Sequence, residues 1–348
     1  MFLALRELLH TKLRYILIGF IMLLVAMLIF IISGLANGLS TDNAGSIKSM
    51  DADELVIDQD ADKQLTDSLM PNTAVSDARE ADNVTKAAPL TIAMSSITKQ
   101  DTDQDADVAV FETDLQGMLV PDVLKGSKPA ESDEVLVDES LQQDGYRVGD
   151  TITFNADDAA YTITGFADHE RFSHTPVVYR ETSHDKVSAV AIQTNGSTAD
   201  LSSSYDVLSK SDVLDGIPSY SQEQASLDMM IVFLFVIAAF VLAVFFYVIT
   251  MQKKAQFGVL KALGISTSYL IRNLMFQMVA ISVVCIAIAI GVTYGVKAMM
   301  PDDMPFIMNT ANMAGVSLLL LVVSVLGSLI SLFQVIKVDP VEAIEGGE

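Results

Sequence analysis

The sequence has a single cysteine, Cys285, so no disulfide can form within one chain. Any large polar domain must therefore fold on its own core. The sequence also lacks the G-x-x-x-x-G-K-[ST] loop that binds nucleotide phosphates, so any ATP it uses is hydrolysed by another chain. No catalytic constellation is found, and His169, His174 and His184 are not spaced like metal ligands. We expect a non-catalytic protein with surface histidines.

Basic residues are scarce, with 21 Lys and Arg against 44 Asp and Glu in 348 residues. The imbalance lies between Gly38 and Ser226, where 36 acidic and 12 basic residues give a net charge of −24, against −23 for the whole chain. This charge argues against nucleic acid or an anionic membrane surface as a partner of the segment. It fits a solvated outer face.

Apolar residues concentrate in four uncharged stretches, which are Tyr15–Ala36, Met229–Met251, Asn273–Val296 and Met313–Ile336. Each is long enough to cross a hydrocarbon core of roughly 30 Å, which takes about 20 helical residues. The first is too long for the apolar part of a signal peptide, so we expect it to remain as an anchor. The prediction is a membrane protein with four transmembrane α-helices and a large α+β extracytoplasmic domain inserted between helices 1 and 2.

The short segments beside these stretches set the orientation, because Lys and Arg stay in the cytoplasm. Arg6, Lys12 and Arg14 precede the first helix, and the loop between the second and third contains four basic residues and no acid. The loop 299–310 instead contains two aspartates. We therefore expect a multi-pass protein of the cell membrane with both termini in the cytoplasm.

The expected domains follow the chain in order. They are an amphipathic cytoplasmic helix (1–14), helix 1 (15–37), the external domain (38–222), helix 2 (223–251), a cytoplasmic segment (252–272), helix 3 (273–298), an external loop (299–310), helix 4 (311–336) and a cytoplasmic tail (337–348).

Within the external domain, β-branched runs predict eight strands, at 53–57, 89–94, 107–112, 134–138, 150–154, 161–166, 176–180 and 189–193. Helices are expected at 61–70 and 211–217. The segment 101–112 places five acids at the positions of a calcium loop, but Ala106 replaces the glycine that the sharp turn needs. An acidic hairpin is the alternative.

The cytoplasmic segment 252–272 predicts a short amphipathic helix. Phe257 and Leu260 contribute to an apolar side, Gly264 suits a left-handed C-cap, and Ser266 suits the N-cap of the next helix. Such a helix could dock in a groove of a partner or lie on the membrane surface.

Two segments, "FGVLKALGIS" (257–266) and "KVDPVEAI" (337–344), together with this topology, resemble the MacB/FtsX-type permeases of ABC transporters. The runs "ISGLANGL", "SYSQEQASLDMMIVFLF" and "MPDDMPF" resemble more narrowly the haem-efflux (haem-regulated transporter) permeases of Gram-positive bacteria. The resemblance implies a permease homodimer with two copies of a separate ATPase that binds ATP and Mg²⁺. It also implies haem as the exported ligand and a mechanotransmission mechanism. Phe257, Leu260, Lys261 and Gly264 would couple to the ATPase.

The resemblance leaves two other functions open. One is a MacB-like exporter of a peptide, lipid or antibiotic, and the other is an FtsX-like signalling permease that controls a cell-wall hydrolase.

Glu223 lies close to the outer end of helix 2 and has two interpretations. In "SQEQ", Ser221 and Gln224 predict a capping box, and Glu223 would then favour the positive end of the helix dipole. Alternatively, its carboxylate binds the haem iron, since it shares a helix face with apolar residues. The predicted haem-binding residues are Glu223, Tyr220, Met230, Leu227, Phe30 and Asn37. No other metal ligand and no cofactor of the permease itself are expected.

Overall fold

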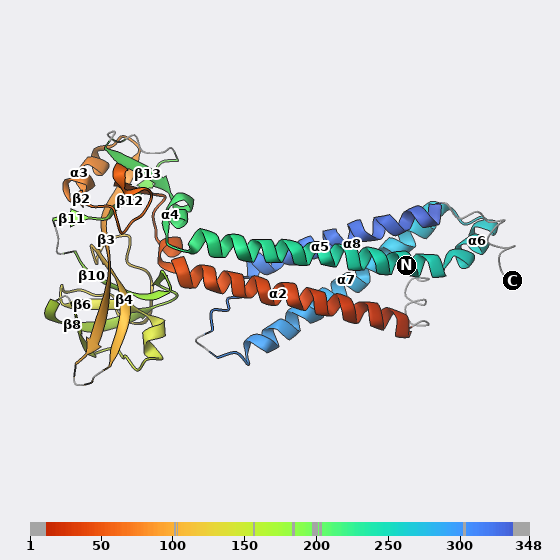
Figure 1. Cartoon of the computed structure of the whole chain (residues 1–348), viewed down its shortest axis with the longest axis horizontal. Coiled ribbons are helices and arrows are strands. Elements are labelled where there is room, and N and C mark those ends of the chain that lie inside the picture. The colour runs from red at the N-terminus through yellow and green to blue at the C-terminus, as the bar shows by residue number, and fades with distance from the viewer. Residues whose placement is uncertain are drawn as a thin grey trace. The chain divides into compact units, whose positions relative to one another are not determined.

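The computed structural model describes residues 12–336, except 101, 103, 156, 183–184, 197–200, 202–203 and 302–303. Most of the amphipathic segment 1–14, the tail 337–348, Asp101, Asp103 and His184 therefore lie outside the described residues. The chain divides into two units, a helical one (Met1–Asn37 and Ser226–Glu348) and one built around a sheet (Gly38–Ala225). Figure 1 shows the elements of both.

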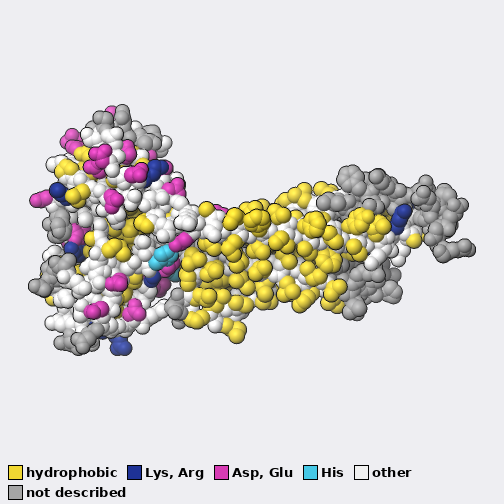
Figure 2. Space-filling view, viewed as in Figure 1, with side chains coloured by type: hydrophobic (Ala, Val, Ile, Leu, Met, Phe, Trp, Pro, Cys, Tyr) yellow, Lys and Arg dark blue, Asp and Glu magenta, His cyan; other side chains and the backbone are white. Residues whose placement is uncertain are grey.

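The helical unit is built from long apolar helices. They are α2 (Lys12–Ser49), α5 (Tyr220–Gln252), α7 (Thr267–Lys297) and α8 (Thr310–Ile336), and α2 and α5 continue into the sheet unit. Four helical segments among the described residues are long and apolar enough to cross a membrane: Gly19–Ser49, Tyr220–Gln252, Thr267–Lys297 and Thr310–Leu329. In Figure 2 hydrophobic side chains cover most of the visible described surface of this unit, as expected for lipid-facing helices.

Side chains from all four helices form the interior of the helical unit. One cluster joins Met22 of α2, Phe246 of α5 and Cys285 of α7, and a second includes Leu320 of α8. The Cys285 thiol donates to the Gly19 carbonyl at 3.3 Å. Gly327 of α8 lies so close to α5 that an added Cβ would be 3.2 Å from the Ala243 nitrogen. Small residues thus allow close helix packing where lipid gives no hydrophobic driving force.

The short helix α6 (Lys254–Ala262) lies between α5 and α7, as the sequence predicts. Gly264 has a φ of +90°, the left-handed conformation that glycine adopts without strain. Ser266 occupies the N-cap position of α7, but its hydroxyl makes no capping hydrogen bond. The predicted helix and its glycine cap are confirmed, whereas the side-chain cap at Ser266 is wrong.

The sheet unit contains an eleven-stranded sheet whose main path runs β13-β1-β12-β3-β4-β10-β6-β8-β5. Most neighbours are antiparallel, but β10 pairs with β4 and β6 with β8 in parallel. The strands are β1 (Glu54–Asp58), β2 (Met70–Pro71), β3 (Val84–Lys99), β4 (Asp105–Thr113), β5 (Val123–Gly126), β6 (Glu134–Asp138), β7 (Thr151–Phe154), β8 (Asp157–Ala167), β9 (Arg171–Phe172), β10 (Thr175–Glu181), β11 (Lys186–Val187), β12 (Ala189–Thr194) and β13 (Tyr205–Ser209). All eight predicted strands are present.

Three apolar cores hold this unit together. The largest packs the sheet against the end of α2, where Ile47 is fully buried, and against α4 (Lys210–Gly216) through Val213. A second fills the space between β3, β4, β6, β7, β8 and β10, where Tyr146 is buried. The third lies under α3 (Thr73–Glu80). Burial of each large apolar side chain contributes about 1.5–3 kcal/mol, so the unit needs no disulfide.

One predicted helix of this unit is wrong. The expected helix at 61–70 is a 3₁₀ turn (Gln59–Ala61) followed by turns, because Asp62 and Lys63 have φ of +46° and +66°. Of the two interpretations of 101–112, the strand favours the acidic hairpin over a calcium loop, because Asp105, Asp107 and Glu112 lie along β4. Asp105 and Asp107 accept hydrogen bonds from Thr98 and Ser96 of β3, as expected for the acidic hairpin. The predicted helix at 211–217 corresponds to α4.

Candidate functional site

The site begins where α2 is interrupted. Ala44 has a φ of −144° and a ψ of 26°, which is not helical, so the carbonyls just before it are open to outside donors. The Ser173 amide donates to the Asn43 carbonyl at 2.7 Å, and the His174 amide donates to the Asp42 carbonyl at 3.2 Å. These backbone bonds attach the turn between β9 and β10 to α2.

That turn is a two-residue hairpin. Phe172 pairs with Thr175, and the residues between them, Ser173 and His174, have φ of +50° and +63°. Two consecutive left-handed residues are typical of a type I′ turn, whose twist matches that of the paired strands. The hairpin therefore presents the His174 ring beside the end of α2.

The first turn of α5 supplies Glu223. Its amide donates to the Ser219 carbonyl at 2.9 Å. The predicted capping box is not formed, because Ser221 lies inside the helix and its hydroxyl donates to the Asp215 carbonyl at 3.3 Å. The amide nitrogen of Gln224 is buried without a partner. The first-turn position of Glu223 is confirmed, but Ser221 is not its cap.

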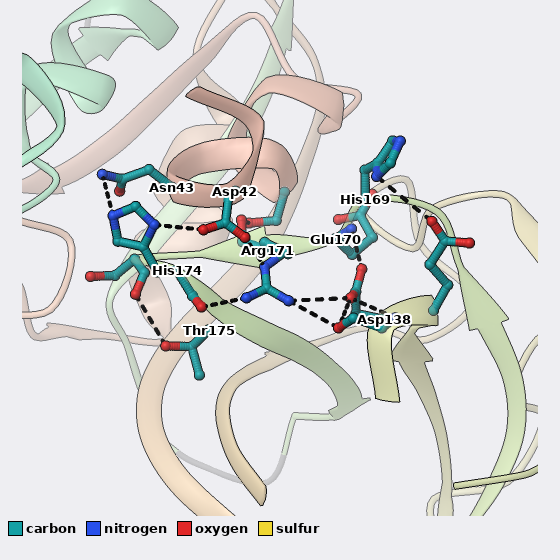
Figure 3. Close-up of polar contacts among 12 residues, drawn as sticks. Asp42, Asn43, Asp138, His169, Glu170, Arg171, His174 and Thr175 are labelled. Atoms are coloured by element: carbon teal, nitrogen blue, oxygen red, sulfur yellow. Dashed lines mark hydrogen bonds and ion pairs between the residues drawn. The ribbon is translucent and has the colours of Figure 1, made fainter. Parts of the chain in front are cut away.

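These elements bring four polar side chains together. Glu223 accepts a hydrogen bond from Asn43 Nδ2 at 3.0 Å, and its other oxygen lies 3.2 Å from His174 Nε2. On the far side of the ring, His174 Nδ1 lies 2.6 Å from Asp42 Oδ2. Figure 3 shows the Asp42, Asn43 and His174 side chains converging. All four residues belong to the sheet unit.

Arg171 extends this cluster into the domain. Its Nε lies 2.5 Å from Asp42 Oδ1, and one Nη donates to the Ser140 hydroxyl at 3.0 Å near the buried Asp138 (Figure 3). Burial raises the pKa of Asp138, against the hydrogen bonds from Ser140 and the Arg171 charge. Burial alone would lower the pKa of His174, but hydrogen bonds with Asp42 and Glu223 outweigh it and raise the pKa above its ordinary value. In this cluster the carboxylates of Glu223, Asp42 and Asp138 alternate with the nitrogen side chains of His174 and Arg171.

Asn43 has no exposed surface, and its Oδ1 atom is buried without a hydrogen-bond partner. Buried polar atoms in native proteins are nearly always satisfied by protein, water or an ion. The cluster that contains this unsatisfied acceptor is therefore a candidate binding site.

The six predicted haem-binding residues fall in both units. In the sheet unit, the Tyr220 hydroxyl lies 3.1 Å from Ser40 Oγ, and Lys48 Nζ lies 5.2 Å from the centre of the Tyr220 ring. In the helical unit, Met230 is 45% exposed and Leu227 is half-buried. Phe30 is instead 3% exposed and packs in the helix core, and Asn37 accepts a hydrogen bond from Asn312 at 2.5 Å.

The predicted coupling residues divide into inward and outward groups. Phe257 is buried against Leu270 and Leu274 of α7, with Leu260 partly buried beside it. Lys261 is half-buried and Gly264 is exposed. Val259 of α6 and Leu263, the residue after it, are exposed apolar side chains, at 48% and 75%. Leu263 belongs to the apolar side expected from the sequence, whereas Val259 was not expected to contribute to it.

A second group of ionisable residues lies near Asp138. Glu139, Asp168 and His169 have ligand atoms within 4.8 Å of one another, although their sequence spacing suggests no metal site. The two nitrogens of His169 face different carboxylates, Glu139 at 3.7 Å and Asp168 at 3.4 Å. The surface position predicted for His169 agrees with its 51% exposure.

Sequence reasoning missed His174, Asn43, Asp42 and Arg171. His174 lies 49 residues before Glu223 and 131 after Asn43, and no local pattern connects these positions. One local signal is the pair of polar residues between two strand-like runs. It predicts a turn, but it does not show which residues that turn contacts.

Comparison with known protein families gives two matches. Residues 17–207 match the MacB-like periplasmic core domain, and residues 229–340 match the FtsX-like permease C-terminal domain. The HrtB protein of Staphylococcus haemolyticus, whose name assigns it provisionally to a hemin transport system as the permease, is 31% identical over 358 residues and 99% of each chain. The corresponding protein of Staphylococcus epidermidis is 30% identical over 99% of each chain. An uncharacterized ABC transporter permease of Mycobacterium tuberculosis is 23% identical over 99% of each chain.

Among solved structures, the periplasmic region of MacB from Actinobacillus actinomycetemcomitans aligns with a TM-score of 0.36 at 12% identity. It covers 48% of this chain and 93% of that chain.

Proposed function

Since the chain belongs to the MacB/FtsX family of ABC transporter permeases, we propose that it is the membrane subunit of an ATP-driven pump that exports haem. Homologues named as permeases match it along its full length. The HrtB name of the staphylococcal relatives supports haem as the substrate. The chain would still be an ABC transporter permease with an extracellular domain if its substrate were not haem.

One observation carries the substrate proposal, the position of the Glu223 carboxylate. It lies in the first turn of α5, and the residues from Met229 to Met251 of the same helix carry no charge. A carboxylate at the start of a long apolar helix suits haem, which combines a flat apolar macrocycle with an iron that accepts oxygen or nitrogen ligands. The four apolar stretches contain no charged residues that could line a pathway. This agrees with a transport mechanism that needs no such pathway, because charged groups inside a membrane are costly.

ATP hydrolysis belongs to a separate ATPase in this proposal, because the sequence contains no nucleotide-binding loop. The contact would involve α6 and the residue after it, because Val259 and Leu263 present apolar surface there. An amphipathic helix of this kind fits a groove on a partner. Two permeases and two ATPases would form the pump, with closure of the ATPases moving the permease helices.

Haem accumulation in cells tests the function. Cells that lack their own haem exporters are given this permease together with its ATPase, the permease alone, or the pair with an ATPase unable to hydrolyse ATP. After exposure to haemin, only the complete active pair should lower cell-associated haem and restore growth. Equal haem content in all three strains would contradict haem export, and the peptide, lipid or antibiotic alternatives would then be tested with the same strains.

A further inference from the structure

Arg272 of α7 is the last charged residue before the apolar stretch of this helix. Residues 273–296 carry no charge, and Lys297 follows them. At 1.5 Å per residue this uncharged segment is about 36 Å long, slightly more than the roughly 30 Å hydrocarbon core of a bilayer. Arg272 and Lys297 therefore lie in the two headgroup layers, and the distribution of Lys and Arg along the chain predicts the cytoplasmic layer for Arg272.

Arg272 lines a cavity of about 290 Å³ together with Tyr269, Asn273 and Phe276. These four positions fall within about 100° of rotation around the helix axis, so they share one face of α7. Arg272 is exposed and Tyr269 is 38% exposed, whereas Asn273 and Phe276 are half-buried. The cavity thus combines a cation, two further hydrogen-bonding side chains and an apolar aromatic ring.

Another side of the same two turns packs against protein. Leu270 and Leu274 are each 1% exposed and contact Phe257 of α6. The α6 contact therefore covers this side of α7 and leaves Arg272 exposed on the side of the cavity. Whatever occupies the cavity lies next to the turns that support α6.

The described part of the helical unit offers Arg272 no nearby carboxylate. Its described residues include a single acid, Asp228, which lies near the predicted outer end of α5. At the predicted cytoplasmic end, Lys253, Lys254, Lys261 and Arg272 lie between residues 252 and 272 without any acid. This end of the unit is therefore positively charged, and an anion from outside the described residues is needed to balance it.

We propose that this cavity binds the headgroup of an anionic phospholipid, whatever substrate the pump exports. The planar guanidinium of Arg272 donates two parallel hydrogen bonds to the lipid phosphate. Helical side chains lean toward the N-terminus of their helix, so the Arg272 side chain extends away from the membrane centre, to the depth of the headgroups. The Tyr269 hydroxyl and Asn273 Nδ2 donate to the remaining phosphate or ester oxygens, and Phe276 contacts the acyl chains.

The depth of the cavity favours a lipid over a protein partner. Phe276 lies one turn inside the uncharged stretch, whereas Tyr269 lies one turn outside it. A carboxylate of the ATPase, or a free phosphate ion, would reach Arg272 from the aqueous side and leave the Phe276 end of the cavity empty. A phospholipid occupies both ends, and the cytoplasmic leaflet attracts basic segments because of its anionic lipids.

Native mass spectrometry of the full-length protein in detergent tests this site, because it resolves each bound lipid. The protein is titrated with phosphatidylglycerol, or with phosphatidylcholine that has the same acyl chains. Arg272→Gln should raise the Kd of the first phosphatidylglycerol by about fivefold, the effect of one Lys or Arg at an anionic surface, and leave phosphatidylcholine binding unchanged. Arg272→Lys keeps the charge but loses the paired hydrogen bonds, so its Kd should be intermediate. Lys297→Gln is the matched control at the other end of the stretch and should behave like the wild type.

Four outcomes would overturn the lipid site. Wild-type phosphatidylglycerol affinity in Arg272→Gln would assign Arg272 to a protein carboxylate instead. Equal losses in Arg272→Gln and Lys297→Gln would show unspecific attraction by net charge. A parallel rise in the Kd of both lipids in Arg272→Gln would indicate a structural effect. Displacement of bound phosphatidylglycerol by excess inorganic phosphate would show that the cavity selects phosphate and not a lipid. None of these outcomes bears on haem export, which the cell experiment tests separately.

Discussion

Glu223 Oε1 lies 3.2 Å from Nε2 of His174, a residue on the turn between β9 and β10. The same carboxylate accepts from Asn43 at the interrupted end of α2. Glu223 therefore connects the start of α5 with the end of α2 and with one hairpin of the sheet. A ligand that competes for this carboxylate must break contacts with both other elements, so binding at Glu223 would loosen their attachment to α5.

The first prediction concerns topology. A reporter inserted at Gly126, in β5 of the sheet unit, should be active only outside the cell, and one at Gln256 of α6 only in the cytoplasm. The physical basis is the excess of Lys and Arg beside α6. Alkaline phosphatase and a fluorescent protein, fused separately at each position, would measure this. Activity of each reporter on the opposite side would contradict the predicted orientation.

The outward face of α6 gives the second prediction. Leu263→Asp introduces a charge at a side chain that is 75% exposed, so it should uncouple ATP hydrolysis from haem export without unfolding the helix. Gly264→Val forces a β-branched residue to a φ of +90° and should have the same effect through strain. Export and ATPase activity are measured in vesicles containing both subunits, with haemin binding as the control. Normal export by both variants would leave α6 as a surface helix only.

The four helices and most of the sheet could be predicted because their signals are local. Uncharged runs of 22 or more residues identify membrane helices by length alone. β-branched runs identified the strands in the same way, and Gly264 marked the end of α6. The helix predicted at 61–70 was wrong because Asp62 and Lys63 adopt left-handed backbone conformations, which form turns instead of a helix. The site was predicted only at Glu223, since contacts between residues 131 apart in the chain depend on tertiary structure.

A buried ion pair provides the third prediction. Arg180 of β10 contacts Glu112 of β4, which is 2% exposed, and the guanidinium also stacks 4.9 Å from the centre of the Phe154 ring. Arg180→Met should lower the free energy of unfolding by about 3–5 kcal/mol, because the buried Glu112 carboxylate loses its Arg180 partner. Urea unfolding of the full chain, followed by tyrosine fluorescence, measures the loss. The double variant with Glu112→Gln should recover much of it, and no recovery would assign the loss to packing.

The fourth prediction is a pH dependence at Glu139. Burial, and then the adjacent Asp168, raises the pKa of Glu139 to about 7. The unfolded chain loses this proton near pH 4.3, so between about pH 4.5 and 7 the folded state binds more protons than the unfolded state. The unfolding free energy must therefore fall as pH rises through this window. Glu139→Gln should weaken that slope, leaving the smaller contributions of Asp138 and Glu170, whose pKa values burial also raises.

Amide hydrogen exchange of the full chain at pH 5 and pH 7.5 measures this slope locally. Protection of segments 134–142 and 168–172 should drop with pH in the wild type, and the drop should be smaller in Glu139→Gln. An equal drop in both proteins would show that Glu139 does not carry the titration.

A haemin titration of Glu223→Gln tests whether the Glu223 carboxylate binds haem iron, as we propose. Glutamine keeps the size of the side chain and can still accept from Asn43, but it removes the anionic oxygen. If Glu223 only favours the helix dipole, the variant loses about 0.3–1 kcal/mol of stability and binds haemin normally. Asp228→Asn is the matched control, because Asp228 is an exposed acid of the same helix. If Glu223 binds the iron, Glu223→Gln should show a shifted Soret band and weakened binding, with Asp228→Asn like the wild type. An unchanged spectrum and Kd in Glu223→Gln would contradict it.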